Sequence, residues 1–128
     1  MSTWTPDELS RIGDAEELRV ASYRRDGTLR KYVIIWVARV GDDLYVRSAY
    51  GPENGWYVRA KRSGTGRIRA GGVERDVTFV DVPASESGTH DAVDAAYREK
   101  YRRQPPNVVA TVVGPKAAAV TLRLEPRD

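Results

Sequence analysis

The residues with the clearest chemical potential are basic, and they are concentrated in one part of the chain. Residues 44–73 carry six Lys and Arg side chains and a single carboxylate, Glu53. Arginine forms planar, bidentate contacts with phosphate, so this segment predicts a small-molecule ligand or cofactor with an anionic group. The formal net charge of the whole chain is only +3, and a solvated basic face is the alternative that the composition leaves open.

The same segment contains groups that could hold a flat ligand. Tyr50, Trp56 and Tyr57 could stack on a planar ring, and the glycines between them would let backbone amides approach an anion closely. As chemistry, this combination fits a phosphorylated flat cofactor or a single-stranded nucleic acid. A surface loop whose Trp56 packs into the core fits equally well.

Metal and nucleophilic catalysis find little support in the sequence. There is no cysteine and one histidine, His90, so a metal site would need carboxylates alone, and we expect none. We expect His90 to be an exposed residue at the start of a helix. A Ser-His-Asp triad would depend on that one histidine, and no nucleophile-elbow motif is present. The glycines of "GTGRIRAGG" also have the wrong spacing for a dinucleotide fingerprint.

Three helices are predicted around these residues. In "TPDEL", Thr5 can cap a helix, Pro6 suits its first position, and Glu8 completes a capping box. A short helix is predicted over residues 56–63 because Gly64 can end it. A longer helix is predicted over residues 89–103, and it ends before two prolines.

Short strands account for most of the remaining chain. The run from Tyr32 to Val40 is apolar at nearly every position, which predicts a central strand covered on both faces. In residues 44–48, Leu44, Val46 and Ser48 should share one face, with Arg47 on the other. Residues 107–114 receive no assignment. Strands are predicted at residues 17–25, 28–40, 44–49, 67–70, 73–82 and 118–126.

About six strands and two to three helices predict a mainly β (α+β) fold, with one antiparallel barrel as a single domain over residues 1–128. The longest apolar run is too short to span a bilayer, and the first residues do not resemble a secretory signal. Without cysteine there is no disulfide. We therefore expect a cytoplasmic protein that does not enter a membrane.

The run from Arg30-Lys31 through "LYVRSAYGPENGWYVRAKRSGTGRIRAGG" resembles the deazaflavin-dependent nitroreductases. These belong to the flavin-binding split β-barrels related to pyridoxamine phosphate oxidase. Nearly the whole chain also resembles a bacterial family of small uncharacterised proteins with that barrel, through "IWV", "LYVRS", "GWYVRA", "AYREKY" and "TLRLEP". The resemblance implies an antiparallel split β-barrel of about six strands with two to three flanking helices.

The resemblance also assigns residues to a cofactor. Arg30 and Lys31, and Ser48 with Gly51, would hold the phosphate tail of the cofactor. Trp56 and Tyr57 take the place of an aromatic pair in that family. Three departures are visible. Ala49 stands where a basic residue is frequent, only one glycine follows it, and Arg59 replaces an asparagine. Arg47 could supply the missing cation. The expected cofactor-binding residues are Arg30, Lys31, Arg47, Ser48, Gly51, Trp56 and Arg59.

The function implied by this resemblance is a flavin- or deazaflavin-dependent oxidoreductase that acts on a small organic substrate. FMN or a deazaflavin coenzyme would supply the hydride chemistry, which would explain why no catalytic residue stands out. Related barrels place the cofactor between two subunits, so we expect a homodimer. We do not expect a nucleic acid as a partner. The alternative is a non-redox ligand-binding protein, or an enzyme without a cofactor, that uses the basic loop to bind an anion.

Overall fold

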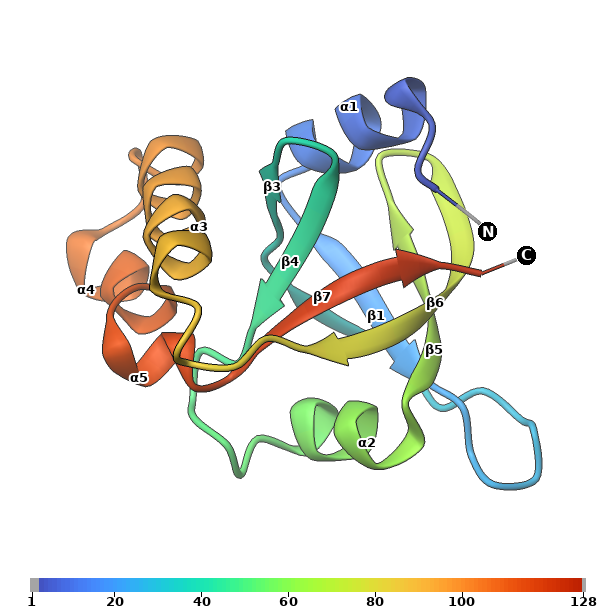
Figure 1. Ribbon diagram of the computed structural model, residues 1–128. Coiled ribbons are helices and arrows are strands. Elements are labelled where there is room, and N and C mark those ends of the chain that lie inside the picture. The colour runs from blue at the N-terminus through green and yellow to red at the C-terminus, as the bar shows by residue number, and fades with distance from the viewer. Residues whose placement is uncertain (1–2, 128) are drawn as a thin grey trace.

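Seven antiparallel strands form one curled sheet in the computed structural model, which describes residues 3–127 (Figure 1). The order of the strands in the sheet is β2-β1-β5-β6-β7-β4-β3. The strands are β1 (Leu18–Ser22), β2 (Val33–Ile35), β3 (Ala38–Val40), β4 (Asp43–Arg47), β5 (Thr65–Ala70), β6 (Val73–Asp81) and β7 (Thr121–Pro126).

The two edge strands are consecutive parts of one extended segment. β2 pairs with β1, whereas β3 pairs with β4 at the opposite edge of the sheet. Residues 36 and 37 lie between them, so this segment bends from one edge to the other and closes the sheet into a barrel. The predicted six strands therefore become seven.

The prediction of a central strand from Tyr32 to Val40 was wrong. Ile34 is 51% exposed and Arg39 is exposed, so the segment is not covered on both faces. Its apolar residues have other partners. Trp36 and Val40 pack beneath a helix on the outside of the barrel, while Ile34 and Ile35 border a pocket. Apolar composition alone did not distinguish these environments from the centre of a sheet.

Two helices lie at opposite ends of the barrel and the others lie along one side (Figure 1). α1 (Pro6–Asp14) begins with the predicted capping box, since Thr5 Oγ1 accepts from Glu8 N at 3.1 Å and Glu8 Oε1 accepts from Thr5 N at 2.9 Å. α2 (Gly55–Ser63) ends at Gly64, whose positive φ of 75° suits glycine. The helices along the side are α3 (Ser87–Lys100), α4 (Pro106–Val109), the 3₁₀ helix η1 (Ala110–Val112) and α5 (Pro115–Ala118).

The apolar side chains form two clusters. The first fills the barrel and includes Leu44 and Val46, as the alternation in β4 predicts. The second lies between the outside of the barrel and α3, and it contains Tyr45, Tyr97 and Tyr101. The residues without an assignment, 107–114, form most of α4 and η1 and complete this outer layer. Within residues 3–127, no helix is long and apolar enough to cross a membrane.

Candidate functional site

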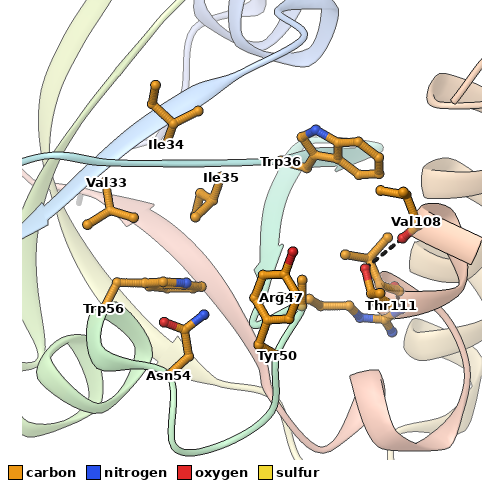
Figure 2. Close-up of a pocket in the computed structure, with 12 residues that line it drawn as sticks. Val33, Ile34, Ile35, Trp36, Arg47, Tyr50, Asn54, Trp56, Val108 and Thr111 are labelled. Atoms are coloured by element: carbon orange, nitrogen blue, oxygen red, sulfur yellow. Dashed lines mark hydrogen bonds between the residues drawn. The ribbon is translucent and has the colours of Figure 1, made fainter. Parts of the chain in front are cut away.

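An apolar pocket of about 300 Å³, here called the ring pocket, opens between β2, the loop before α2, and the α4–η1 segment (Figure 2). Its aromatic side chains are Trp36, Tyr50 and Trp56, and Asn54 is one of its few polar groups. The volume is at the lower end of the range for small-molecule sites. The other lining residues are Val33, Ile34, Ile35, Arg47, Ala49, Val108, Thr111 and Val112.

The aromatic sides of the ring pocket are supported from behind. Trp56 lies in the first turn of α2, is 5% exposed, and meets Tyr57 edge to face at a centroid distance of 5.9 Å. Trp36 stacks on Tyr101, with ring centroids 3.9 Å apart. Lys100 donates to the carbonyl of Val37 at 2.8 Å, and its burial lowers its pKa to about 8. These contacts fix the two indole rings before any ligand binds.

A second opening, here called the arginine groove, has a volume of about 450 Å³ and lies between α2 and the hairpin loop of residues 23–30. Arg30 and Arg59 line it and are half-buried, and neither has an acidic partner within residues 3–127. Half-buried arginines without a carboxylate form a favourable site for an external anion. The remaining lining residues are Tyr23, Arg24, Arg25, Arg62, Ser63 and Thr65.

A small cavity of about 10 Å³, here called the neck, lies between the two openings. It shares Val33 and Trp56 with the ring pocket, and it shares Arg30 and Arg59 with the arginine groove. Lys31 also lines the neck. The two openings are therefore neighbouring parts of one site, and a ligand with a flat ring and a thin anionic tail would suit both.

Local contacts hold the cations of the groove in place. Arg24 donates to Thr28 Oγ1 at 3.3 Å and to the Leu29 carbonyl at 3.2 Å. Hydrogen bonds from Thr28 lower the pKa of Asp26, which keeps the Asp26 carboxylate at the tip of the hairpin ionised. On α2, a Cβ atom at Gly55 would lie 2.8 Å from Arg59 Nη1. The glycine thus lets the Arg59 side chain fold back along its own helix.

Arg47 does not join this group of cations. Its side chain is fully buried, and its guanidinium makes five hydrogen bonds within the protein. It donates to Thr121 Oγ1 and to the Val112 carbonyl, both at 2.8 Å, and it forms an ion pair with Asp94. A guanidinium has five N–H groups, so none is left for a ligand. Arg47 instead holds η1 and α3 against the barrel beneath the ring pocket.

Two further expectations change at this point. His90 is buried rather than exposed, because Arg47 Nη2 lies 3.1 Å from its Nδ1 and the Pro83 carbonyl lies 2.9 Å from its Nε2. Ser48 is also buried, and its hydroxyl donates to the Gly51 carbonyl at 2.5 Å. In this structure Ser48 and Gly51 shape the loop beside the ring pocket, and neither lines the neck.

Of the seven predicted residues, the structure brings Arg30, Lys31, Trp56 and Arg59 together around the neck. The sequence analysis missed the other cations of the groove, because Arg24 and Arg25 precede the Asp26-Gly27 turn, far in sequence from α2. The signal was present as a pair of arginines at a hairpin tip. Asn54 was also missed, because an asparagine before a helix ordinarily serves as a cap.

Comparisons with known proteins define the family and the fold. A family described as "Uncharacterized protein conserved in bacteria (DUF2255)" matches residues 8–124, and the chain belongs to this family. No curated protein sequence matches the chain.

Several solved structures have a similar fold. A conserved hypothetical protein from Mycobacterium tuberculosis has a TM-score of 0.61 at 14% identity, over 98% of this chain and 82% of that one. An FAD-binding protein from Mesorhizobium loti has a TM-score of 0.59 at 14% identity, over 99% and 93%. A protein named F420 reductase has a TM-score of 0.56 at 14% identity, over 93% and 92%. These matches confirm the predicted antiparallel split β-barrel.

Proposed function

We propose that this member of the DUF2255 family binds FMN or a deazaflavin coenzyme and uses it as an oxidoreductase on a small organic substrate. The flat ring would occupy the ring pocket, the thin tail would pass the neck beside Lys31, and the phosphate would lie in the arginine groove against Arg30 and Arg59. The observation that carries the proposal is the pair of half-buried arginines without a carboxylate, beside a buried tryptophan at the junction of the two openings.

The energetic argument concerns Arg30 and Arg59. A cation that is partly removed from water loses hydration, and a carboxylate ordinarily compensates for that loss. Elsewhere in this protein arginines follow that rule, because Arg67 bonds both Glu74 and Asp76 at about 3 Å. Arg30 and Arg59 have no such partner within residues 3–127. A phosphate in the arginine groove would supply charge-assisted hydrogen bonds worth about 1.5–3 kcal/mol each.

The ring pocket supports a reaction performed by a cofactor. No Asp, Glu, His or Lys side chain of the described residues lines it, and Arg47 has no free N–H group. The protein thus offers no proton donor or acceptor that titrates near neutral pH there. When bound, a flavin or deazaflavin ring supplies the hydride transfer itself. The chain would then bind the phosphate, orient the ring between aromatic walls and exclude water.

The names of two similar structures agree with this choice of cofactor. One is an FAD-binding protein and another is an F420 reductase, and both share the barrel over more than nine-tenths of each chain. An identity of 14% supports the fold and a flavin-type binding site as a starting hypothesis.

The test is a titration of FMN and of the deazaflavin coenzyme against the wild type, Arg59→Ala and Arg98→Ala. Arg98 is exposed on α3 outside the arginine groove, so its loss changes net charge equally and serves as the matched control. We expect Arg59→Ala to weaken binding about tenfold or more, because it removes charged contacts to phosphate. We expect Arg98→Ala to bind like the wild type.

Two outcomes would contradict the proposal in different ways. If the wild type binds neither cofactor, the proposed cofactor binding fails. If a cofactor binds, but its reduced form is not oxidised by any of a panel of small organic acceptors, the oxidoreductase assignment fails. The chain would then be a non-redox ligand-binding protein.

A further inference from the structure

We infer that Asn54 and the indole N–H of Trp56 recognise the polar edge of the bound ring, and that this edge is uncharged and carries a carbonyl group. This inference rests on the proposed function, because it assumes that a flat ring occupies the ring pocket. It assigns a role in ring recognition to two neutral groups, separate from the cations that would hold the phosphate.

The first step concerns Trp56. The residue is 5% exposed, yet its Nε1 has no hydrogen-bond acceptor within residues 3–127. No fully buried side-chain nitrogen or oxygen in that range lacks a partner, so the indole nitrogen of Trp56 must reach open space. Trp4 shows the ordinary alternative, since its Nε1 donates to the Leu124 carbonyl at 3.0 Å. Because Trp56 lines the ring pocket and the neck, its N–H is available to a ligand there.

The second step concerns Asn54. It occupies the N-cap position of α2, where asparagine commonly accepts a bond from the helix, but here its side chain makes no capping bond. The side-chain amide has no other partner within residues 3–127. Figure 2 shows this amide close to Trp56 on the same side of the ring pocket. An uncapped asparagine forgoes a stabilising bond, and a ligand would supply the missing one.

The third step concerns the charge and the remaining polar groups of the ring pocket. The charge of Arg47 is paired with Asp94, and its donors are engaged. Thr111 donates its hydroxyl to the Val108 carbonyl at 2.6 Å (Figure 2). Trp36 and Tyr50 add an indole N–H and a hydroxyl, and both groups are also uncharged.

Neutral donors therefore dominate the enclosed part of the pocket. An indole can only donate, whereas an amide donates and accepts. This combination is complementary to a neutral carbonyl next to an N–H group, as in an amide or imide edge of a heterocycle. A carboxylate or a protonated amine on the ring would meet no counter-charge there.

The test uses Asn54→Asp, Trp56→Phe and the matched control Asn107→Asp. Asn107 is exposed on α4 and does not line the ring pocket, so its substitution adds the same charge near the same opening. FMN affinity and the carbonyl stretching bands of the bound ring are measured for each protein. We expect Asn54→Asp to weaken FMN binding roughly tenfold, because a carboxylate replaces a donor and repels the carbonyl. Asn107→Asp should match the wild type.

Trp56→Phe keeps an aromatic ring but removes the N–H group. We expect a carbonyl band of the bound ring to move to higher frequency, and packing alone would not produce that shift. Circular dichroism checks that each variant is folded, and Asn54→Asp still decides the question if Trp56→Phe is unstable. Wild-type affinity and unshifted bands in both variants would overturn the inference while leaving cofactor binding intact. A wild type that binds no flavin or deazaflavin would instead overturn the proposed function.

Discussion

Arg47 is the bulkiest of the fully buried side chains in the described residues, and its surroundings explain why a charge is tolerated there. Asp94 neutralises it, while Thr121, His90 and the Val112 carbonyl accept its remaining N–H groups. These partners belong to β7, α3 and η1. One side chain thus joins the barrel to the outer helical layer that borders the ring pocket.

At this residue we predict a loss of stability rather than a direct loss of ligand contacts. Arg47→Met should lower the free energy of unfolding by about 3–5 kcal/mol, because it leaves the Asp94 carboxylate without its counter-charge. The double variant Arg47→Met with Asp94→Leu should recover part of that loss, because no charge remains unpaired. Urea unfolding of the wild type, both single variants and the double variant measures the coupling energy. Additive effects would show that the ion pair does not couple the two residues.

Gly66 lies where the neighbouring strands approach too closely to leave room for a side chain. A Cβ atom at Gly66 in β5 would lie 2.2 Å from the Ala21 carbonyl oxygen of β1 and 2.7 Å from Phe79 Cε2 of β6. Gly88 in α3 offers the matched comparison, because a Cβ atom there would meet nothing within 4 Å. Packing therefore requires a glycine at position 66, whereas a side chain at position 88 would enter open space.

We predict opposite effects for the two alanine substitutions. Gly66→Ala should destabilise the protein by about 1–3 kcal/mol or more, because the strands must separate. Gly88→Ala should stabilise it by about 0.5–1 kcal/mol, because alanine restricts the unfolded chain and favours helix. Thermal unfolding of both variants checks the pair. Equal effects would mean that the β1–β5 approach is looser than the structure shows.

The elements that the sequence predicted well are those whose signals are local. The capping box of Thr5 and Glu8, the helix end at Gly64 and the alternation around Leu44 and Val46 all depend on neighbours within a few residues. The burial of His90 depends instead on Arg47, 43 residues away, and no local pattern contains that information.

The candidate site was predictable only in part, for the same reason. Charge and resemblance selected Arg30, Lys31, Trp56 and Arg59, which the structure brings together. Alternation in β4 already put Arg47 on the face of Tyr45, but only the structure reveals that α3 covers this face. The bend after β2 was equally hidden, because two edge strands and one long central strand have similar composition.

The exposed apolar surface of the molecule is gathered at the ring pocket. Among residues 3–127, the large exposed hydrophobic side chains are Ile34, Tyr50 and Val108, with exposed fractions of 51%, 81% and 37%, and all three line this pocket. β2 is also an edge strand. Clustered apolar residues around a site indicate a surface that another molecule covers. We propose that a second copy of the chain covers it.

We therefore predict a homodimer at micromolar concentration. Ile34→Asp combined with Tyr50→Asp should shift the protein to monomer, because two carboxylates would enter an apolar interface. The control, Lys116→Asp combined with Asn107→Asp, changes exposed residues that do not line the pocket. Sedimentation velocity of the three proteins measures the result. A monomeric wild type would contradict the prediction.

The position of β7 has a consequence for how the protein is made. β7 follows every other strand along the chain, yet it lies between β6 and β4 and supplies the only strand pairing that joins β3 and β4 to the rest of the described sheet. During synthesis, the growing chain can pair β5 with β6, but its two halves cannot be joined until residues 121–126 have left the ribosome. Translation proceeds at about 5–20 residues per second, so the apolar interior stays uncovered for several seconds. We therefore expect the barrel to close only after residues 121–126 have been synthesised, although β5 and β6 can pair earlier.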